Sequence, residues 1–321
     1  MSASVKTLTP QLIFERSRTT ARDQAVFVGK LFIVLALGTA GITLVLTENP
    51  VGVVAGILVL GALYTHMVEL QHQCLHHSAF VKGPPHRTVG VLLGLPMLVS
   101  YSHYRIRHLQ HHRYLGTDQD TEFFGFDTRQ PLTAGVMLRG MFDYQRLAAV
   151  AGDSWRSWRG TWEADNDTIS ARMRRDSMGE YRLMGVVVLA AAALTLLGHG
   201  ALVLQLWLLP MLLVSTPLHF LVELPEHIRC DNDTDDVLRN TRSISGSWFS
   251  TWYTNGNNLH IEHHAAMTVP INRLHERHDE VLRFAKHTER SYWTFYGGVL
   301  REVVTHTRRR GSTRTAGTDP R

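Results

Sequence analysis

A block of forty residues without Asp, Glu, Lys or Arg, from Leu183 to Val222, constrains the fold of this chain more than any other feature. Crossing the hydrocarbon core of a bilayer takes about 20 helical residues, so the block is long enough for two spans. The sequence GHG at 198–200 interrupts it and predicts the turn between them. Buried core helices of a soluble protein are the competing interpretation, but they seldom need an uncharged run of this length.

Two further apolar runs near the N-terminus predict a second hairpin of the same kind. Residues 26–46 are apolar apart from Lys30, whose long side chain can reach the interface. Residues 51–68 carry no formal charge, and the residues TENP between the two runs are typical of a turn. The fold class that we predict is therefore an all-α integral membrane protein with four transmembrane helices, arranged as two hairpins.

The distribution of basic residues predicts the orientation of the chain. Neither outer turn contains Lys or Arg, whereas the N-terminal arm and the segment 102–182 are rich in Arg. The positive-inside rule therefore places both termini and that segment in the cytoplasm. The apolar run 89–101 is too short to span and predicts a re-entrant or interfacial segment that bends at Pro96. The domains that we expect are a cytosolic N-terminal arm over 1–25, a membrane domain over 26–305 and a disordered basic tail over 306–321.

Histidine is the residue type that points to a function. The chain has 19 histidines, and imidazole is the commonest metal ligand in proteins, whereas its two cysteines predict no disulfide framework. The segments HQCLHH, HLQHH and HIEHH space their histidines so that they lie on or near one face of a helix. All three segments fall on the cytoplasmic side of the predicted topology. The predicted metal ligands in these three boxes are His72, His76, His77, His108, His111, His112, His260, His263 and His264.

These histidines exceed the needs of one metal ion, because a single zinc site takes three or four ligands. We therefore expect two metal ions. Imidazole binds iron, zinc and copper. A lipid-facing site without a nucleophile motif favours redox iron, although the residues alone leave zinc open. A zinc transporter or metal-binding receptor would carry polar ligands near mid-membrane, whereas His66 and His219 lie near the cytoplasmic ends of their predicted spans.

The order and spacing of the three boxes resemble the membrane-bound fatty acid desaturase and hydroxylase superfamily, over roughly residues 60–305. The resemblance implies a di-iron centre that activates O₂, held by a helical cytosolic cap. By analogy, His227 in the segment ELPEHIRC is a further metal ligand. The first box has Gln73 where many members have an acid, and the third box runs HHAAMTVP where a bulky residue and Pro usually follow sooner. These departures leave the substrate subgroup open.

Polar residues near the boxes are predicted to orient the ligands, because a metal-bound imidazole usually donates its other N–H to a carboxylate or carbonyl. The candidates for this role are Asp118, Asp120, Glu226, Asn257 and Asn258, together with Glu262 inside the third box. Two histidines beyond the third box, His275 and His278, are expected to be surface residues.

The chemistry that these expectations favour is O₂-dependent oxidation of a lipid or of a carrier-bound acyl chain, most simply by an acyl desaturase that introduces a C=C bond. A hydroxylase or ketolase that acts on a carotenoid or another lipid is the alternative, because the same ligands serve both and substrate placement decides between them. No Gly-rich dinucleotide motif is present. We therefore expect electrons from a separate ferredoxin-like donor that binds the basic cytoplasmic surface. The net charge of +5 is too small to indicate a nucleic-acid partner.

Overall fold

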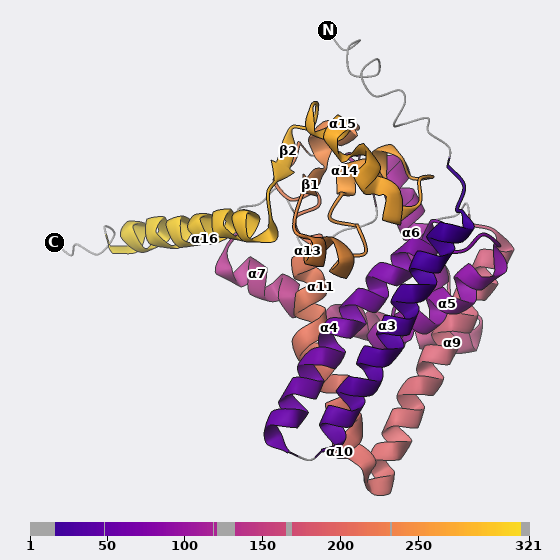
Figure 1. Ribbon diagram of the computed structural model, residues 1–321. Coiled ribbons are helices and arrows are strands. Elements are labelled where there is room, and N and C mark those ends of the chain that lie inside the picture. The colour runs from indigo at the N-terminus through magenta and orange to yellow at the C-terminus, as the bar shows by residue number, and fades with distance from the viewer. Residues whose placement is uncertain are drawn as a thin grey trace.

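The computed structural model is a bundle of long helices with a smaller cap at one end (Figure 1). It describes residues 17–47, 49–117, 119–120, 132–164, 169–231 and 233–315, with side chains up to residue 305. The first part of the chain forms α3 (Ala21–Leu46), α4 (Pro50–Leu75), α5 (Pro84–Gly94), the 3-10 helix η1 (Leu95–Met97) and α6 (Tyr101–Tyr114). The middle part forms α7 (Ala134–Met141), α8 (Gln145–Arg159), α9 (Ala171–Leu194), η2 (Thr195–His199), α10 (Gly200–Val203), η3 (Leu204–Leu208), η4 (Pro210–Ser215) and α11 (Thr216–Glu223). The last part forms α12 (Val237–Asn240), β1 (Arg242–Ile244), α13 (Trp248–Tyr253), α14 (His260–Ala265), η5 (Ile271–Arg277), α15 (His278–Leu282), β2 (His287–Glu289) and α16 (Tyr292–Thr315).

Among the described residues, three helical stretches are long and apolar enough to cross a membrane, and the mostly helical fold class is confirmed. They cover Ala21–Leu46, Pro50–Leu75 and Ala171–Glu223. The third is not one straight helix, because Gly198 has a φ of +92°, a conformation that glycine adopts without steric cost. The chain reverses there, so that α9 and the arm from α10 to α11 form the two sides of a hairpin (Figure 1).

The hairpin of α3 and α4 is held by a capped turn and close helix packing. The Asn49 side chain caps α4 by accepting a hydrogen bond from the Val51 backbone N–H at 2.9 Å. At Gly56, a Cβ atom would lie 2.6 Å from the carbonyl oxygen of Gly41, so only glycine allows the two backbones to approach this closely. Large apolar side chains remain exposed on the outer faces of the bundle, such as Leu196 at 89%. An apolar outer surface of this kind suits contact with lipid.

The short apolar run before the second box forms a bent connection rather than a span. Helix α5 ends at Gly94, Pro96 lies in η1, and Leu98 has a left-handed φ of +54°. The chain therefore turns at the position where the sequence predicts a bend. Helix α6 then begins with Ser100 as its N-cap, which accepts a hydrogen bond from the His103 backbone N–H at 3.2 Å.

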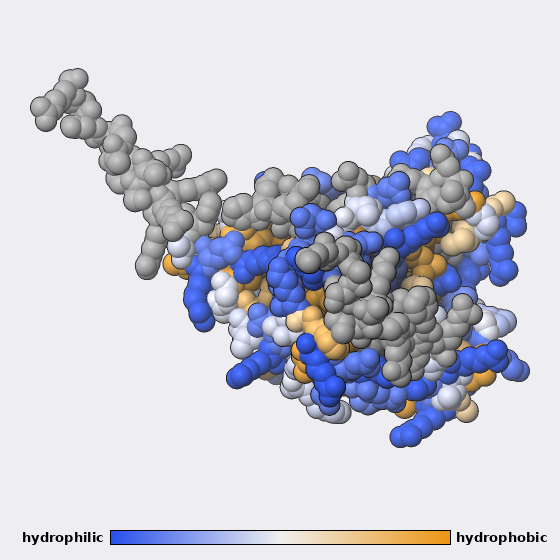
Figure 2. Space-filling view, turned by 90° about the horizontal axis from the view of Figure 1, so that it is seen from above, coloured by the Kyte–Doolittle hydropathy of each residue, from blue (hydrophilic) through white to orange (hydrophobic). Residues whose placement is uncertain are grey.

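The cap contains the third histidine box and a small amount of sheet. Strands β1 and β2 pair in parallel, with Arg242 opposite His287, and α14 packs against β1. Seen from above, the face of the cap is mainly hydrophilic (Figure 2). Helix α16 extends away from the cap and reaches Thr315, into the segment predicted to be a disordered tail, while residues 316–321 lie outside the described residues.

Candidate metal centre

Four segments bring the predicted ligands together at the junction of bundle and cap. Helix α4 ends at the first box, α6 carries the second, α14 carries the third, and the turn after α11 adds His227. The histidine nitrogens form two groups, and within each group all the ligand atoms lie within 4.8 Å of one another. Group one contains His72, His76, His108, His112 and His263. Group two contains His111, His227, His260 and His264.

The Nε2 atoms of group one converge from three helices. His108 Nε2 lies 2.7 Å from His72 Nε2 and 2.8 Å from His76 Nε2. His112 Nε2 lies 3.0 Å from both His108 Nε2 and His263 Nε2. Two imidazoles that bind one ion at right angles, each with a bond of about 2.1 Å, have donors about 3 Å apart. The observed separations therefore match donors arranged around one ion.

Group two depends on the histidine that lies outside the three boxes. His227 Nε2 lies 3.2 Å from His111 Nε2 and 3.1 Å from His260 Nε2. His264 Nε2 lies 3.1 Å from His260 Nε2. His227 therefore lies between the second box and the third. Its location in the sequence, after the fourth apolar run, does not predict this contact with both boxes.

The buried and half-buried histidines of both groups favour the neutral form, which is the form that binds metal. Burial, and then the neighbouring imidazoles, hold the pKa of these side chains well below the usual value of histidine: His76, His112, His260, His263 and His264. An all-imidazole donor set without cysteine suits iron, zinc or copper.

The ring nitrogens that point away from the groups are held by oxygen atoms. His111 Nδ1 lies 3.0 Å from both carboxylate oxygens of Asp120, which is buried. His227 Nδ1 lies 3.1 Å from the carbonyl oxygen of Asn240. His260 Nδ1 lies 3.0 Å from Asn257 Oδ1. Hydrogen bonds of this kind fix the ring orientation and leave Nε2 for the metal.

The other residues predicted to orient ligands have different positions. Glu226 accepts a hydrogen bond from Asn257 Nδ2 at 2.7 Å, and its Oε2 lies 3.2 Å from His260 Nε2. Glu226 therefore lies beside the Nε2 atom that His260 contributes to group two, and not beside the Nδ1 atom on the other side of that ring. Asn258 Nδ2 donates to the carbonyl oxygen of Ile244 in β1 at 2.6 Å and to Thr251 Oγ1 in α13 at 3.3 Å, so it holds α13 and β1 together. No contact between Asn258 and a box histidine is observed among the described residues. Asp118 lies outside the described residues.

His77 is not brought to either group. Helix α4 ends at Leu75, and His77 has a left-handed φ of +54°, so its side chain leaves the face that carries His72 and His76. Its ring stacks on that of His86, with 4.8 Å between the ring centroids. The histidine spacing of the first box predicts three ligands, but the end of the helix removes the third.

The structure contradicts two expectations, namely that Glu262 orients a metal ligand and that His278 is a surface residue. His275 is exposed as expected. Glu262 is fully buried and faces away from the metal groups, because it accepts a hydrogen bond from Ser243 Oγ at 2.5 Å. His278 lies with its Nδ1 2.5 Å from Glu262 Oε1, and its side chain is only 17% exposed. The segment η5–α15 folds back on α14 and covers this pair. The sequence carries no local signal for that contact.

Gln73, which replaces an acid of the family pattern, has a structural role that an acid would not fill. Its amide nitrogen donates to the carbonyl oxygen of Ser78 at 3.1 Å, and its amide oxygen accepts from Asn255 Nδ2 at 3.0 Å. A carboxylate has no N–H to donate. Gln73 therefore links the end of α4 both to its own turn and to the loop before α14.

His66 and His219, which lie near the cytoplasmic ends of the predicted spans, belong to neither group. His66 Nδ1 lies 2.6 Å from the carbonyl oxygen of Tyr253, and the His66 ring stacks on Trp252. His219 Nε2 lies 3.3 Å from Glu223 Oε1. The candidate metal donors therefore lie at the cap end of the apolar helices and not along them, which disfavours a transporter.

Comparison with known proteins identifies relatives of the chain. The fatty acid desaturase family model matches residues 48–296. Dihydrorhizobitoxine desaturase from Bradyrhizobium elkanii is 26% identical to the chain over 235 residues. That match covers 68% of this chain but 65% of the relative, so the chain spans slightly less than two thirds of the length of this relative.

Proposed function

Because the chain belongs to the fatty acid desaturase family, we propose that it is an O₂-dependent di-iron oxidoreductase that introduces a C=C bond into an aliphatic acyl chain. The observation that carries this proposal is the pair of adjacent histidine groups. Each group presents four or five imidazoles at separations that fit one ion, and the outward nitrogens of His111, His227 and His260 are held by oxygen atoms. The relative from Bradyrhizobium elkanii is itself a desaturase by name.

Two iron ions bound by these groups would supply the oxidising power that an unactivated methylene requires. The balanced reaction converts CH₂–CH₂, O₂, two electrons and two protons to CH=CH and two molecules of water. The protein positions the reacting chain, holds the imidazoles neutral by burial, and fixes their orientation. Asp120 has the clearest orienting role, because its carboxylate accepts the N–H of His111 with both oxygens.

We further propose four membrane spans, formed by α3, α4, α9 and the arm from α10 to α11. The C-terminal end of α3, the N-terminal end of α4 and the turn at 198–200 lie at the end of the bundle opposite the cap, as expected if all of them face outward (Figure 1). Neither turn contains Lys or Arg, which supports a cytoplasmic location for the cap and both termini. A separate electron donor of the ferredoxin type would then reach the metal centre from the cytoplasm.

The proposed function is tested with the full chain purified with iron. Metal analysis should give about two irons per chain, since the histidines form two groups. With ferredoxin, its reductase and O₂, mass spectrometry of the lipid product should reveal the loss of two hydrogen atoms. Gain of one oxygen atom would favour the hydroxylase alternative. One tightly held zinc ion with no O₂ consumption would contradict the proposal.

A further inference from the structure

A cavity of about 270 Å³ lies directly below the metal centre, between α4, α6, α8 and α11. Val68, Tyr104 and Glu223 line it, and each precedes a candidate ligand by four residues, namely His72, His108 and His227. Four residues correspond to about one helical turn, or about 6 Å. The Tyr104 ring also lies 5.6 Å from the His108 ring, centroid to centroid. One end of the cavity therefore lies against group one.

The cavity is short. Its wall on α11 runs from Thr216 to Glu223, and its wall on α6 runs from Ser100 to Arg107. Seven residues of helix span about 10 Å, which an extended chain covers in about eight covalent bonds at roughly 1.2 Å per bond. A volume of 270 Å³ likewise holds about nine groups of water size, at about 30 Å³ each. An acyl chain of sixteen or eighteen carbons is about twice as long as this cavity.

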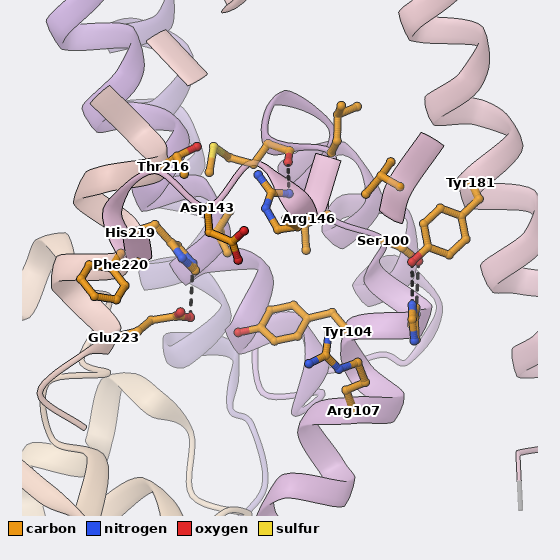
Figure 3. A pocket seen from close by; sticks show the side chains of 17 residues that line it. Ser100, Tyr104, Arg107, Asp143, Arg146, Tyr181, Thr216, His219, Phe220 and Glu223 are labelled. Atoms are coloured by element: carbon orange, nitrogen blue, oxygen red, sulfur yellow. Dashed lines mark hydrogen bonds and ion pairs between the residues drawn. The ribbon is translucent and has the colours of Figure 1, made fainter. Parts of the chain in front are cut away.

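A cationic side chain lies at the end of the cavity away from the two histidine groups. Arg146 donates from one nitrogen to the carbonyl oxygen of Met97 at 2.7 Å, and Met97 precedes α6. Its other terminal nitrogen is buried and has no hydrogen-bond partner among the described residues. In Figure 3, Arg146 lies beside Asp143, and Tyr104, Arg107 and Glu223 lie at the opposite end. A buried N–H of a charged group without an acceptor is costly, so the cavity favours a ligand that supplies one.

The charges around the cavity limit what that ligand can be. A guanidinium binds a carboxylate or a phosphate through paired N–H groups. Asp143, Glu223 and a second cation, Arg107, also line the cavity. Asp143 and Glu223 act on Arg146 and would repel any added anion, but they repel a dianionic phosphate more strongly than a singly charged carboxylate. A carboxylate brings one negative charge and can accept the Arg146 N–H that has no partner among the described residues. Apolar walls from Val68, Phe220 and Val150 suit the rest of a short aliphatic chain.

We propose that this cavity is the substrate site, and that it takes a short aliphatic carboxylate of about eight carbons, with the carboxylate on Arg146 and the methyl end toward the histidines. This substrate proposal rests on the proposed function, because the carbon to be oxidised would lie at the Tyr104 end of the cavity, next to the metal groups. It differs from the binding of a long acyl chain on a carrier, because the length of the cavity selects against a long chain and the buried cation selects against an uncharged ester or thioester. Arg146 is then a determinant of substrate specificity.

Binding of octanoate tests the proposal without turnover. Full-chain protein loaded with iron is held without O₂ or reductant, and free octanoate is measured by equilibrium dialysis, with micelles alone as the blank. Wild-type protein should bind octanoate at least ten times more tightly than methyl octanoate or octadecanoate. Arg146→Met should weaken octanoate about 10-fold to 100-fold, as expected for a hydrogen bond to a charged group, and leave methyl octanoate unchanged. Arg159→Met, an exposed change on the same helix, is the matched control.

Two results with wild-type protein would overturn the proposal. Equal affinity of wild-type protein for octanoate and methyl octanoate would overturn the role of the cation, whatever the fate of any variant. Octadecanoate that binds as tightly as octanoate would overturn the length limit. If Arg146→Met does not fold, Arg146→Lys replaces it, and this variant should keep a preference for octanoate, reduced severalfold; a folded variant that binds octanoate and methyl octanoate with the wild-type affinities would contradict the contact. Because no oxidation is measured, failure of the proposed function would appear in the iron and product assays and not here.

Discussion

Replacing His227 with Ala should remove one metal ion and leave the other. His227 is one of four donors in group two and contributes none to group one. Four-donor zinc sites bind with apparent free energies of about 10–16 kcal/mol, or about 2.5–4 kcal/mol per donor if the donors share equally. At 1.4 kcal/mol per tenfold, the loss of this imidazole weakens the metal of group two by about 10²–10³-fold. The five donors of group one remain.

The assay is iron content during competition with a chelator of known affinity. Wild-type protein should release two irons at high chelator concentration, whereas His227→Ala should hold about one iron and lose the other at 10²–10³-fold less chelator. Activity should fall with the first iron lost. His275→Ala is the control, because His275 is exposed and lies outside both groups. Its iron content and activity should match the wild type.

Two results would refute this reasoning. A folded His227→Ala protein that keeps two irons with unchanged chelator competition would remove His227 from the donor set. Loss of both irons at the same chelator concentration would mean that the two groups act as one site. A thermal unfolding curve for each variant separates these results from a general loss of fold, since His227 is only partly buried.

Further predictions concern the outer contacts of the centre and the topology. Asp120→Asn keeps the shape of the side chain but removes the charge facing His111, so chelator competition should reveal a group-two metal weakened about 10-fold to 100-fold. His278→Ala leaves Oε1 of buried Glu262 without its partner, while Ser243 still donates to Oε2, and should cost about 1–3 kcal/mol of stability by thermal or denaturant unfolding. Glu262 raises the pKa of His278. The stabilisation is therefore fully present below the unfolded pKa of about 6.5 and is lost as pH rises through the raised value, so wild type and variant should converge at alkaline pH; a gap that widens there would contradict the pairing. A cysteine at position 49 should react with an impermeant maleimide on intact cells and one at position 283 should not; the reverse pattern would invert the topology.

Much of the architecture follows from the sequence because it depends on local patterns. The uncharged run 183–222 and the turn at Gly198 predict a helical hairpin, and the structure has one. The spacing of the second and third boxes predicts imidazoles on one helical face, and these imidazoles converge. Helical periodicity and apolar length act over a few residues, so they can be read without knowing which segments meet.

Tertiary structure decided how the histidines are divided and which of them take part. His108 and His112 belong to group one, whereas His111, on the same helix, belongs to group two. Their spacing predicts a shared face but not the division, which depends on the placement of α4 and α14. His77 has the spacing of a donor but lies past the end of α4, while Glu262 is directed to His278, sixteen residues away, by the folding of η5 and α15. A side chain's partner across the fold is set by the packing of distant segments, and periodicity along one helix contains no information about that packing.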